Sequence, residues 1–405
     1  MLIGRLLLAL KYKTILRLFI KVLGLIKLII FARLLGPIGL GVFGASSLLM
    51  NFFETFTDMG VYVLLMQERN GLKRIINQAF TISILRGFIV SSLIFISVPF
   101  SEVFFNSVDV KRVLLLLSII PFLKGFINPA IIKYEKYLNF DKEFKLRAFL
   151  ILIDSMFSII FVYFFKAPEG IVMGLIISAV FELLFSWVFI SPKPKIELNI
   201  GKLRMIIKEG KWITLNGILN YLYHNIDDIF VSKFLGLNDL GIYQTSYKIS
   251  TIVIYETGEI FGRVSLPIYS KVSSDYTKLK NVFIKILLYI TIISLLLGGT
   301  LFLFASSIVI IFLGQEWLII VPLIKILIFF GMIKSITGSV TPFFYSIKKQ
   351  KEIMKVMLIG LVLLVILIYP LIRIFGLYGA AFSTLFSVIF TIPFIYVYLK
   401  KYLFF

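Results

Sequence analysis

Runs of about 20 apolar residues recur along the whole chain, separated by short segments rich in charges, glycine or proline. A bilayer core about 30 Å thick needs about 20 helical residues at 1.5 Å each. Twelve runs predict twelve spanning helices, at residues 14–35, 40–66, 75–100, 112–132, 146–165, 170–190, 212–235, 240–268, 282–304, 318–345, 354–374 and 377–399. Of the 405 residues, 60% are hydrophobic and 16% charged, and mean hydropathy is +1.01. We therefore expect an all-α polytopic membrane protein.

The basic residues predict the orientation of these spans. The chain has 42 Lys and Arg against 21 Asp and Glu, a formal net charge of +21. The Lys and Arg residues lie in short connections and not along one soluble face, so nucleic acid is not an expected partner. Most occupy the termini and the connections after even-numbered spans. Because cytoplasmic connections hold the excess of Lys and Arg, we expect a multi-pass protein of the cytoplasmic membrane with both termini in the cytoplasm.

Several kinds of chemistry are excluded by what the sequence lacks. It has no cysteine and one histidine, His224, which rules out disulfides, thiolate catalysis and multi-histidine metal sites. It has no phosphate-binding G-x-x-x-x-G-K-[ST] loop, Gly-rich dinucleotide loop or DxD pair. We expect neither an enzyme nor a resident metal or cofactor, although a coupling H⁺ or Na⁺ is compatible with the sequence.

The two halves of the chain share a sequence pattern. The segment ARLLGPIGLGVFGAS (32–46) aligns with SKFLGLNDLGIYQTS (232–246), and after a two-residue shift Glu54 aligns with Glu256. A weaker match joins GLIIS (174–178) to GAAFS (379–383). We expect a six-helix lobe at 1–190, a cytoplasmic linker at 191–211 and a second lobe at 212–405. Such a repeat predicts a pseudo-two-fold axis along the membrane normal with a cavity between the halves, as in many transporters.

Four segments together resemble the polysaccharide transporter family, the Wzx-type lipid-linked oligosaccharide flippases of the multidrug/oligosaccharidyl-lipid/polysaccharide exporter superfamily. They are ARLLGPIGLGVFG, NFFETFTDMGVYVLLMQ, LNYLYHNIDDIFVSKFLGLNDLGIY and GLYGAAFSTL. The resemblance follows the whole chain in order and implies a MATE-like fold of two pseudo-symmetric six-helix lobes. It implies a cargo, an undecaprenyl-pyrophosphate-linked oligosaccharide repeat unit flipped by alternating access for surface polysaccharide biosynthesis. Implied partners are membrane lipids, a polysaccharide polymerase and chain-length machinery.

Cations inside the predicted spans are candidates for holding the pyrophosphate. A charge at mid-bilayer costs about 2.5–3.5 kcal/mol on insertion scales, so it normally faces a bundle interior or a watery cavity. The candidates are Lys21, Lys27, Arg86, Lys124, Lys248, Arg263, Lys325 and Lys334. Pairing with acids stays open as the structural alternative for each, and Arg263 lies one turn beyond Glu259. Lys13 and Arg17 are expected to extend to the cytoplasmic headgroups.

Acids and a polar stripe complete the candidate site. Carboxylates in the spans are expected to neutralise cations or to bind the coupling ion. These acids are Glu54, Asp58, Asp154, Asp227, Asp228 and Glu256. A stripe on the seventh predicted span, expected to face the cavity, consists of Asn216, Asn220, Tyr223 and His224 with Asp227. We expect His224 to hydrogen-bond Asp227 or Asp228 in preference to acting as a proton relay.

Two other functions compete with a glycolipid flippase. The first is a cation-coupled exporter of small molecules with the same fold, and the second is a membrane-embedded glycan polymerase or acyltransferase. The excess of cations inside the spans favours an anionic cargo over a cationic drug. The predicted outer connections are all short, which disfavours a polymerase with a substantial outer loop.

Overall fold

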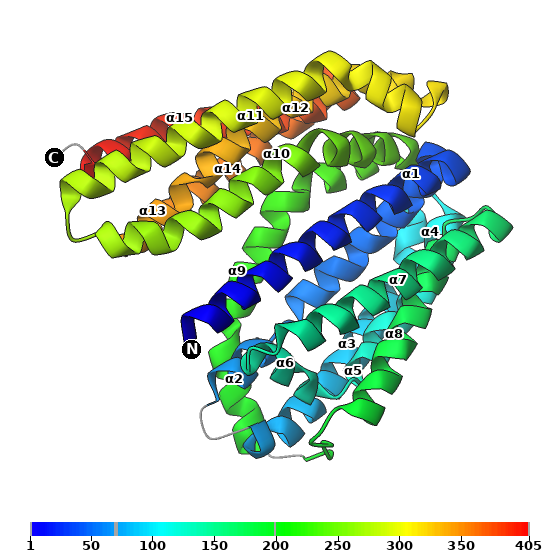
Figure 1. The fold of residues 1–405 in the computed structure, drawn as a ribbon. Coiled ribbons are helices and arrows are strands. Elements are labelled where there is room, and N and C mark those ends of the chain that lie inside the picture. Colours follow the sequence, from blue (N-terminus) through cyan, green and yellow to red (C-terminus); the bar gives the residue numbers. More distant parts are fainter. Residues whose placement is uncertain (1, 69–71, 198–199, 404–405) are drawn as a thin grey trace. The chain divides into compact units, whose positions relative to one another are not determined.

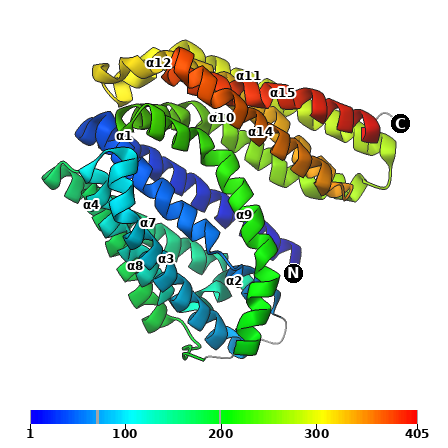
Figure 2. The same ribbon diagram turned by 180° about the vertical axis from the view of Figure 1, so that it is seen from behind.

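The computed structural model describes residues 2–68, 72–197 and 200–403, and its elements are labelled in Figures 1 and 2. Helices make up nearly all of this part of the chain, and no strand occurs in it. In hydrocarbon no water can pair with the backbone, so a spanning segment satisfies its own N–H and C=O groups as a helix. The predicted all-α polytopic fold is confirmed.

The helices follow one another with short connections. In chain order they are α1 Leu2–Phe56, α2 Val61–Gln67, η1 Leu72–Arg74, α3 Ile76–Phe105, α4 Val108–Leu117, α5 Ile119–Gly125, η2 Pro129–Ile132, α6 Lys133–Lys136, α7 Phe140–Phe165, α8 Glu169–Phe189, α9 Ile200–Phe234, α10 Leu237–Val272, α11 Tyr276–Phe312, η3 Gln315–Ile320, α12 Val321–Gly338, α13 Val340–Ser346, α14 Gln350–Phe375 and α15 Leu377–Leu403.

Many of these helices are long and apolar enough to cross a membrane. Within the part of the chain searched for such helices, seven qualify: α3, α7, α8, α11, the stretch from η3 to α13, α14 and α15. A pair bent by 74°, Val108–Gly125 with Pro129–Lys136, would make an eighth. Each of the twelve predicted spans overlaps at least one helix, and α1 carries the first span and most of the second.

The second predicted span, 40–66, is not continuous. Helix α1 ends at Phe56 and α2 begins at Val61, with Gly60 at a φ of +67° between them. Asp58 accepts a hydrogen bond from the Gly60 backbone N–H at 3.0 Å, a local bond that competes with the helix. The expectation that Asp58 lies inside a spanning helix is therefore wrong, because an aspartate followed by a left-handed glycine ends α1.

The chain divides into two compact units, Met1–Tyr221 and Leu222–Phe405, and the division falls within α9. In unit 1, α7 packs against both α1 and α8, and α3 packs against α5. In unit 2, α10 packs against α12, and α14 against α15. The lobe limits expected from the sequence, with a linker at 191–211, stay a prediction.

The backbone repeats itself at the junction of the first two helices of each half. Gly36 has φ +66° and ψ −173°, and Gly236, with which it aligns in the sequence repeat, has φ +90° and ψ −177°. This region is essentially restricted to glycine. The glycine redirects the chain, and a helix starts again at Pro37 or Leu237. The aligned glycines therefore have the same structural role in both halves.

Two further junctions repeat between the halves, at a slightly larger offset in the numbering. Leu138 and Lys348 both have φ +60°, and each is followed shortly by the first residue of a long helix, α7 or α14. Lys166 and Gly376 both have positive φ just after those helices end. The predicted duplicated unit is confirmed in the backbone.

A glycine near the start of the last helix of each half packs closely against the preceding helix. A Cβ on Gly379 would lie 2.7 Å from the Ile372 nitrogen, and a Cβ on Gly170 would lie 2.6 Å from the Val162 nitrogen. Val162 and Ile372 are themselves separated by the same offset as Leu138 and Lys348. Close helix contact thus recurs near the start of α8 and of α15, and the predicted match of 174–178 with 379–383 stays a prediction.

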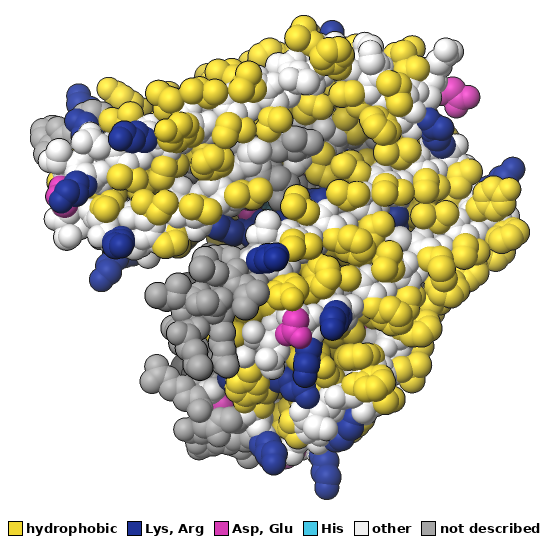
Figure 3. Space-filling view, viewed as in Figure 1, with side chains coloured by type: hydrophobic (Ala, Val, Ile, Leu, Met, Phe, Trp, Pro, Cys, Tyr) yellow, Lys and Arg dark blue, Asp and Glu magenta, His cyan; other side chains and the backbone are white. Residues whose placement is uncertain are grey.

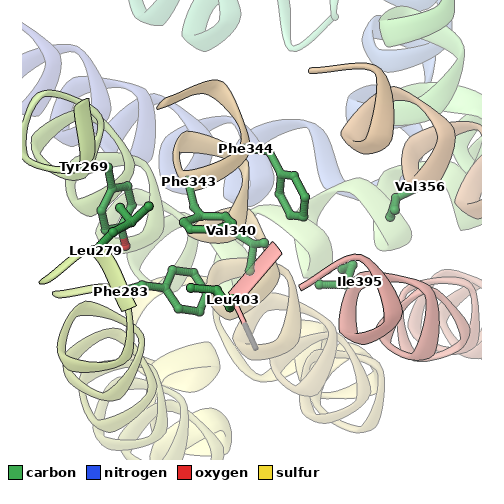
Figure 4. Packing of buried hydrophobic residues seen from close by; sticks show 9 residues of the cluster. All are labelled: Tyr269, Leu279, Phe283, Val340, Phe343, Phe344, Val356, Ile395 and Leu403. Atoms are coloured by element: carbon green, nitrogen blue, oxygen red, sulfur yellow. The ribbon is translucent and has the colours of Figure 1, made fainter. Parts of the chain in front are cut away.

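Unit 2 has a buried cluster where α10, α11, α13, α14 and α15 meet. It consists of Tyr269, Leu279, Phe283, Val340, Phe343, Phe344, Val356, Ile395 and Leu403 (Figure 4). The Phe283 and Phe343 rings have centroids 4.9 Å apart. Such aromatic pairs contribute about 0.5–1.5 kcal/mol beyond their buried area. Figure 3 shows many exposed apolar side chains along the helices, as expected for surfaces in contact with lipid.

We expect Gly36→Ala to lower the melting temperature of the purified protein. A Cβ at Gly36 would meet nothing within 4 Å, so the loss would come from backbone strain, about 1–3 kcal/mol. Gly24→Ala is the matched control, because Gly24 lies inside helical α1 and also has open space around it. Equal melting temperatures for the two variants would contradict a strained junction at Gly36.

Candidate functional site

Lys27 and Asp154 form a buried ion pair between α1 and α7. The Lys27 Nζ lies 2.6 Å from Asp154 Oδ2, and the two side chains are 15% and 13% exposed. The Ser158 hydroxyl donates to the other carboxylate oxygen at 3.0 Å. Both oxygens of Asp154 therefore accept hydrogen bonds, and the two charges neutralise each other. This arrangement stabilises the contact of α1 with α7 and leaves Lys27 less suited to hold a cargo.

The Arg86 side chain caps the C-terminal end of α1. Its guanidinium Nη2 donates to the backbone carbonyl of Glu54 at 2.8 Å. Glu54 lies in the last turn of α1, where carbonyls lack helical partners and a cation is favoured by the helix dipole. The Arg86 Nε is buried with no hydrogen-bond partner among the described residues. Arg86 thus has a structural role in unit 1 and keeps one donor unused.

Lys124 approaches the same glutamate from α5. Its Nζ lies 3.8 Å from Glu54 Oε1, and its side chain is 48% exposed. An ion pair this long and this exposed contributes little energy, typically below about 1 kcal/mol. The structure thus brings Glu54, Arg86 and Lys124 together. Of these two cations, Lys124 is the more available to an anion.

Other polar contacts of unit 1 were not predicted. Lys13, expected at the headgroups, is paired with Glu135 of α6, and that carboxylate also accepts from the Tyr62 hydroxyl at 2.6 Å. Arg147 lies 2.8 Å from Glu182. Sequence spacing does not indicate these pairs, because their partners come from different helices.

Lys21 and Asp58 have separate positions in unit 1. Lys21 is half-buried on α1. Asp58 lies in the turn after α1, where its backbone carbonyl accepts a hydrogen bond from the Thr214 hydroxyl.

In unit 2 two adjacent acids on α9 face α10. Asp227 is buried and accepts a hydrogen bond from the Tyr243 hydroxyl at 2.8 Å. Asp228 accepts one from the Gln244 amide at 2.9 Å. Tyr243 and Gln244 were missed as site residues. The repeat alignment held a signal, since Tyr243 aligns with Phe43 and so adds a hydroxyl at that position.

Lys334 of α12 reaches the same region. Its Nζ lies 2.7 Å from the Tyr223 hydroxyl and 4.0 Å from the centre of that ring. Its charge also attracts Asp227, and the charge of the exposed Lys248 attracts Asp228. The structure thus groups two predicted cations with two predicted acids.

The remaining predicted cations of unit 2 have local partners. Arg263 lies 3.2 Å from Glu259, the i,i+4 partner considered from the sequence, and this pair is largely exposed. Lys325 is half-buried, with its Nζ 4.9 Å from the centre of the Phe302 ring. The side chain of Glu256 lies outside the described residues.

The polar stripe of α9 is exposed over most of its length. Asn216, Asn220 and His224 are exposed, whereas Tyr223 is half-buried and Asp227 buried. The His224 ring packs edge-on against Tyr223, with centroids 5.1 Å apart. The described hydrogen bonds to the two aspartates come from α10. The expectation that His224 bonds them stays a prediction.

Lys124 and Lys334 have equivalent places in the repeat. Each precedes, by the same number of positions, the turn residue with φ +60°, Leu138 or Lys348. Each also approaches an oxygen atom of an earlier helix of its own unit, from Glu54 or Tyr223. The repeat therefore supplies one comparable cation in each unit.

Comparison with known proteins gives the family of this chain. Residues 30–322, more than half of the chain, match the polysaccharide biosynthesis protein family. The chain belongs to this family. The predicted resemblance to Wzx-type polysaccharide transporters is confirmed.

Two curated relatives support the family assignment. The lipopolysaccharide biosynthesis protein WzxC of Escherichia coli K12 is 23% identical over 80% of this chain and 67% of its own length. The teichuronic acid biosynthesis protein TuaB of Bacillus subtilis 168 is 22% identical over 70% of this chain and 59% of its own length. The chain therefore spans about three fifths to two thirds of these relatives.

Solved structures share the fold at low sequence identity. The lipid II flippase MurJ in an inward closed conformation has a TM-score of 0.75 and 18% identity, covering 96% of this chain and 87% of MurJ. An inward-facing multidrug MATE transporter of the MOP superfamily has a TM-score of 0.63 and 14% identity, covering 96% and 94%. The predicted MATE-like fold of this family member is confirmed, and the chain is a multi-pass membrane protein.

We expect Lys27→Met to reduce the free energy of unfolding by about 3 kcal/mol or more, because Asp154 would stay buried without its counter-charge. Lys27→Met with Asp154→Leu should recover most of this loss. The measurement is a double-mutant cycle on the purified protein. Arg263→Met, which breaks an exposed pair, serves as control and should cost under about 1 kcal/mol. Equal losses for Lys27→Met and Arg263→Met would contradict a buried structural pair.

Proposed function

We propose that this protein is a flippase that moves undecaprenyl-pyrophosphate-linked oligosaccharide repeat units across the cytoplasmic membrane by alternating access. The observation that supports this function is the pair of repeat-equivalent lysines, Lys124 and Lys334. Membership of a polysaccharide biosynthesis family and a fold shared with a lipid II flippase support the same cargo class. The product would serve surface polysaccharide synthesis, and the chain would act as a transporter and not as an enzyme.

The two lysines suit a pyrophosphate because of what they contact. Each ammonium offers three donors, and hydrogen bonds between charged groups are about twice as strong as neutral ones. Lys124 faces its glutamate at 3.8 Å, and Lys334 donates to a neutral hydroxyl at 2.7 Å. A charged phosphate oxygen at hydrogen-bond distance would bind each ammonium more strongly than the distant glutamate or the neutral hydroxyl does. The Glu54 carboxylate would partly neutralise the charge of Lys124 until an anionic cargo takes the place of Glu54.

We assign the coupling ion, H⁺ or Na⁺, to Asp227 and Asp228. Asp154 is already neutralised by Lys27 at 2.6 Å, which makes it a poor carrier of a mobile ion. Asp227 and Asp228 are adjacent and accept hydrogen bonds from the neutral Tyr243 and Gln244. Two neighbouring carboxylates of low exposure repel each other, so binding one cation relieves that repulsion.

We further propose that both termini lie in the cytoplasm and that the protein acts beside a polysaccharide polymerase and chain-length machinery. The excess of Lys and Arg in the connections after even-numbered spans supports this orientation. An outward-moving flippase would deliver its cargo to a polymerase on the outer side.

Lys124→Ala and Lys334→Ala should each reduce glycan export at least tenfold at matched membrane abundance, because each removes a charge-assisted contact worth about 1.5–3 kcal/mol. The measurement is surface glycan in a flippase-deficient cell that the wild-type protein restores, with lipid-linked repeat units counted on the inner leaflet. Lys278→Ala is the control, since Lys278 is 73% exposed and paired with Asp275 outside this group. The same cells, assayed with sodium removed or with a protonophore, identify the coupling ion.

Two outcomes would contradict the proposal. Export unchanged in both lysine variants would remove these residues from cargo binding. Efflux of small organic cations without restored glycan export would replace the flippase with a drug exporter of the same fold.

The orientation can be tested with single cysteines, because the natural chain has none. We expect a cysteine at Lys278 to react with an impermeant maleimide only in inverted vesicles. A cysteine at Arg112, in a predicted outer connection, should react in intact spheroplasts. The opposite pattern would reverse the proposed topology.

A further inference from the structure

A groove on the surface of unit 1 has no role in the function proposed above. It lies between α1 and α7 and has a volume of about 370 Å³, within the range of small-molecule sites. Its walls include Ile30, Arg33 and Leu34 of α1 and Ile160, Tyr163 and Phe164 of α7. Among the described lining residues only Arg33 carries a charge.

The groove lies at one end of these two helices. Arg33 comes shortly before the bend at Gly36, and Tyr163 shortly before α7 ends at Phe165. By the orientation proposed above, this end faces the outer leaflet. Tyrosine and arginine at a helix end are typical of the membrane interface, where lipid phosphates lie. The groove therefore extends from the headgroup region of the bilayer into its acyl-chain region.

Exposure shows that the groove opens outward from the unit. The side chains of Tyr163 and Phe164 are 62% and 73% exposed, and Ile160 is 39% exposed. Such side chains on a spanning helix contact lipid. Arg33 is exposed as well.

We propose that this groove binds a phospholipid of the outer leaflet, with one acyl chain between α1 and α7 and the phosphate on Arg33. The groove surface is apolar, which suits an acyl chain, and Arg33 lines it with the apolar stem of its side chain. The guanidinium of this exposed residue would meet the phosphate at the edge of the groove. Guanidinium binds phosphate through two parallel hydrogen bonds, which gives it a preference over an uncharged head. The Tyr163 hydroxyl lies at the same end and is a further donor for the headgroup.

The test is native mass spectrometry of the purified full chain in mild detergent, titrated with palmitoyl-oleoyl-phosphatidylglycerol. We expect the wild type to retain one lipid that Arg33→Ala binds roughly tenfold more weakly, the effect of losing one charge-assisted contact. Ile160→Trp, which fills the groove, should remove the same site. Diacylglycerol with the same chains should bind the wild type about as weakly as phosphatidylglycerol binds Arg33→Ala.

The matched control is Arg112→Ala, the same substitution at an exposed arginine of α4 that pairs with Asp109 at 3.6 Å. It should retain wild-type lipid affinity. Equal affinities of Arg33→Ala and Arg112→Ala, or equal binding of diacylglycerol and phosphatidylglycerol, would overturn the proposal. Displacement of phosphatidylglycerol by equimolar undecaprenyl phosphate would also overturn it and assign the groove to the cargo tail.

Discussion

The salt bridge between Lys27 and Asp154 illustrates the constraint on which the structure depends. A charge inside a spanning helix must be neutralised by another helix or reach water, since hydrocarbon offers neither. Here the pair is 2.6 Å long, nearly buried and completed by Ser158, so it also ties α1 to α7. Arg86 obeys the same constraint by a different route, because it neutralises the negative end of α1 at the Glu54 carbonyl. These charge contacts therefore also hold neighbouring helices together.

The two halves share a backbone but differ in their chemistry. Gly36 and Gly236 redirect the chain in the same way, and Leu138 and Lys348 make the same turn. Side chains at equivalent places have diverged. Position 27 is a lysine paired with a carboxylate, whereas position 227 is an aspartate bonded to a tyrosine. Duplication thus preserved the positions of helices and left each half free to acquire its own charges.

This divergence gives the two units different parts in the proposed cycle. Unit 1 holds its carboxylate Asp154 in a neutral pair, while unit 2 keeps two adjacent aspartates bonded to neutral groups. Both units retain a lysine at the same place in the repeat, Lys124 and Lys334. The proposed function therefore assigns one cargo-binding lysine to each unit and the coupling ion to unit 2. The groove at Arg33, proposed to bind a lipid, is formed by α1 and α7 of unit 1 alone.

The sequence by itself determined most of the spanning helices, the repeat and the list of candidate charges. Hydropathy over the length of one span and the spacing of glycines are local properties, and a bilayer leaves helices as the main solution for an apolar chain. Only the tertiary structure decided which charges meet. Periodicity places Asp154 or Asp227 on a face of its helix but does not say which helix packs there, so Ser158, Tyr243 and the Glu54 carbonyl could not be predicted as partners. The end of α1 before Asp58 was also missed, because the hydrogen bond that the Gly60 N–H donates to Asp58 outweighed a largely apolar pattern.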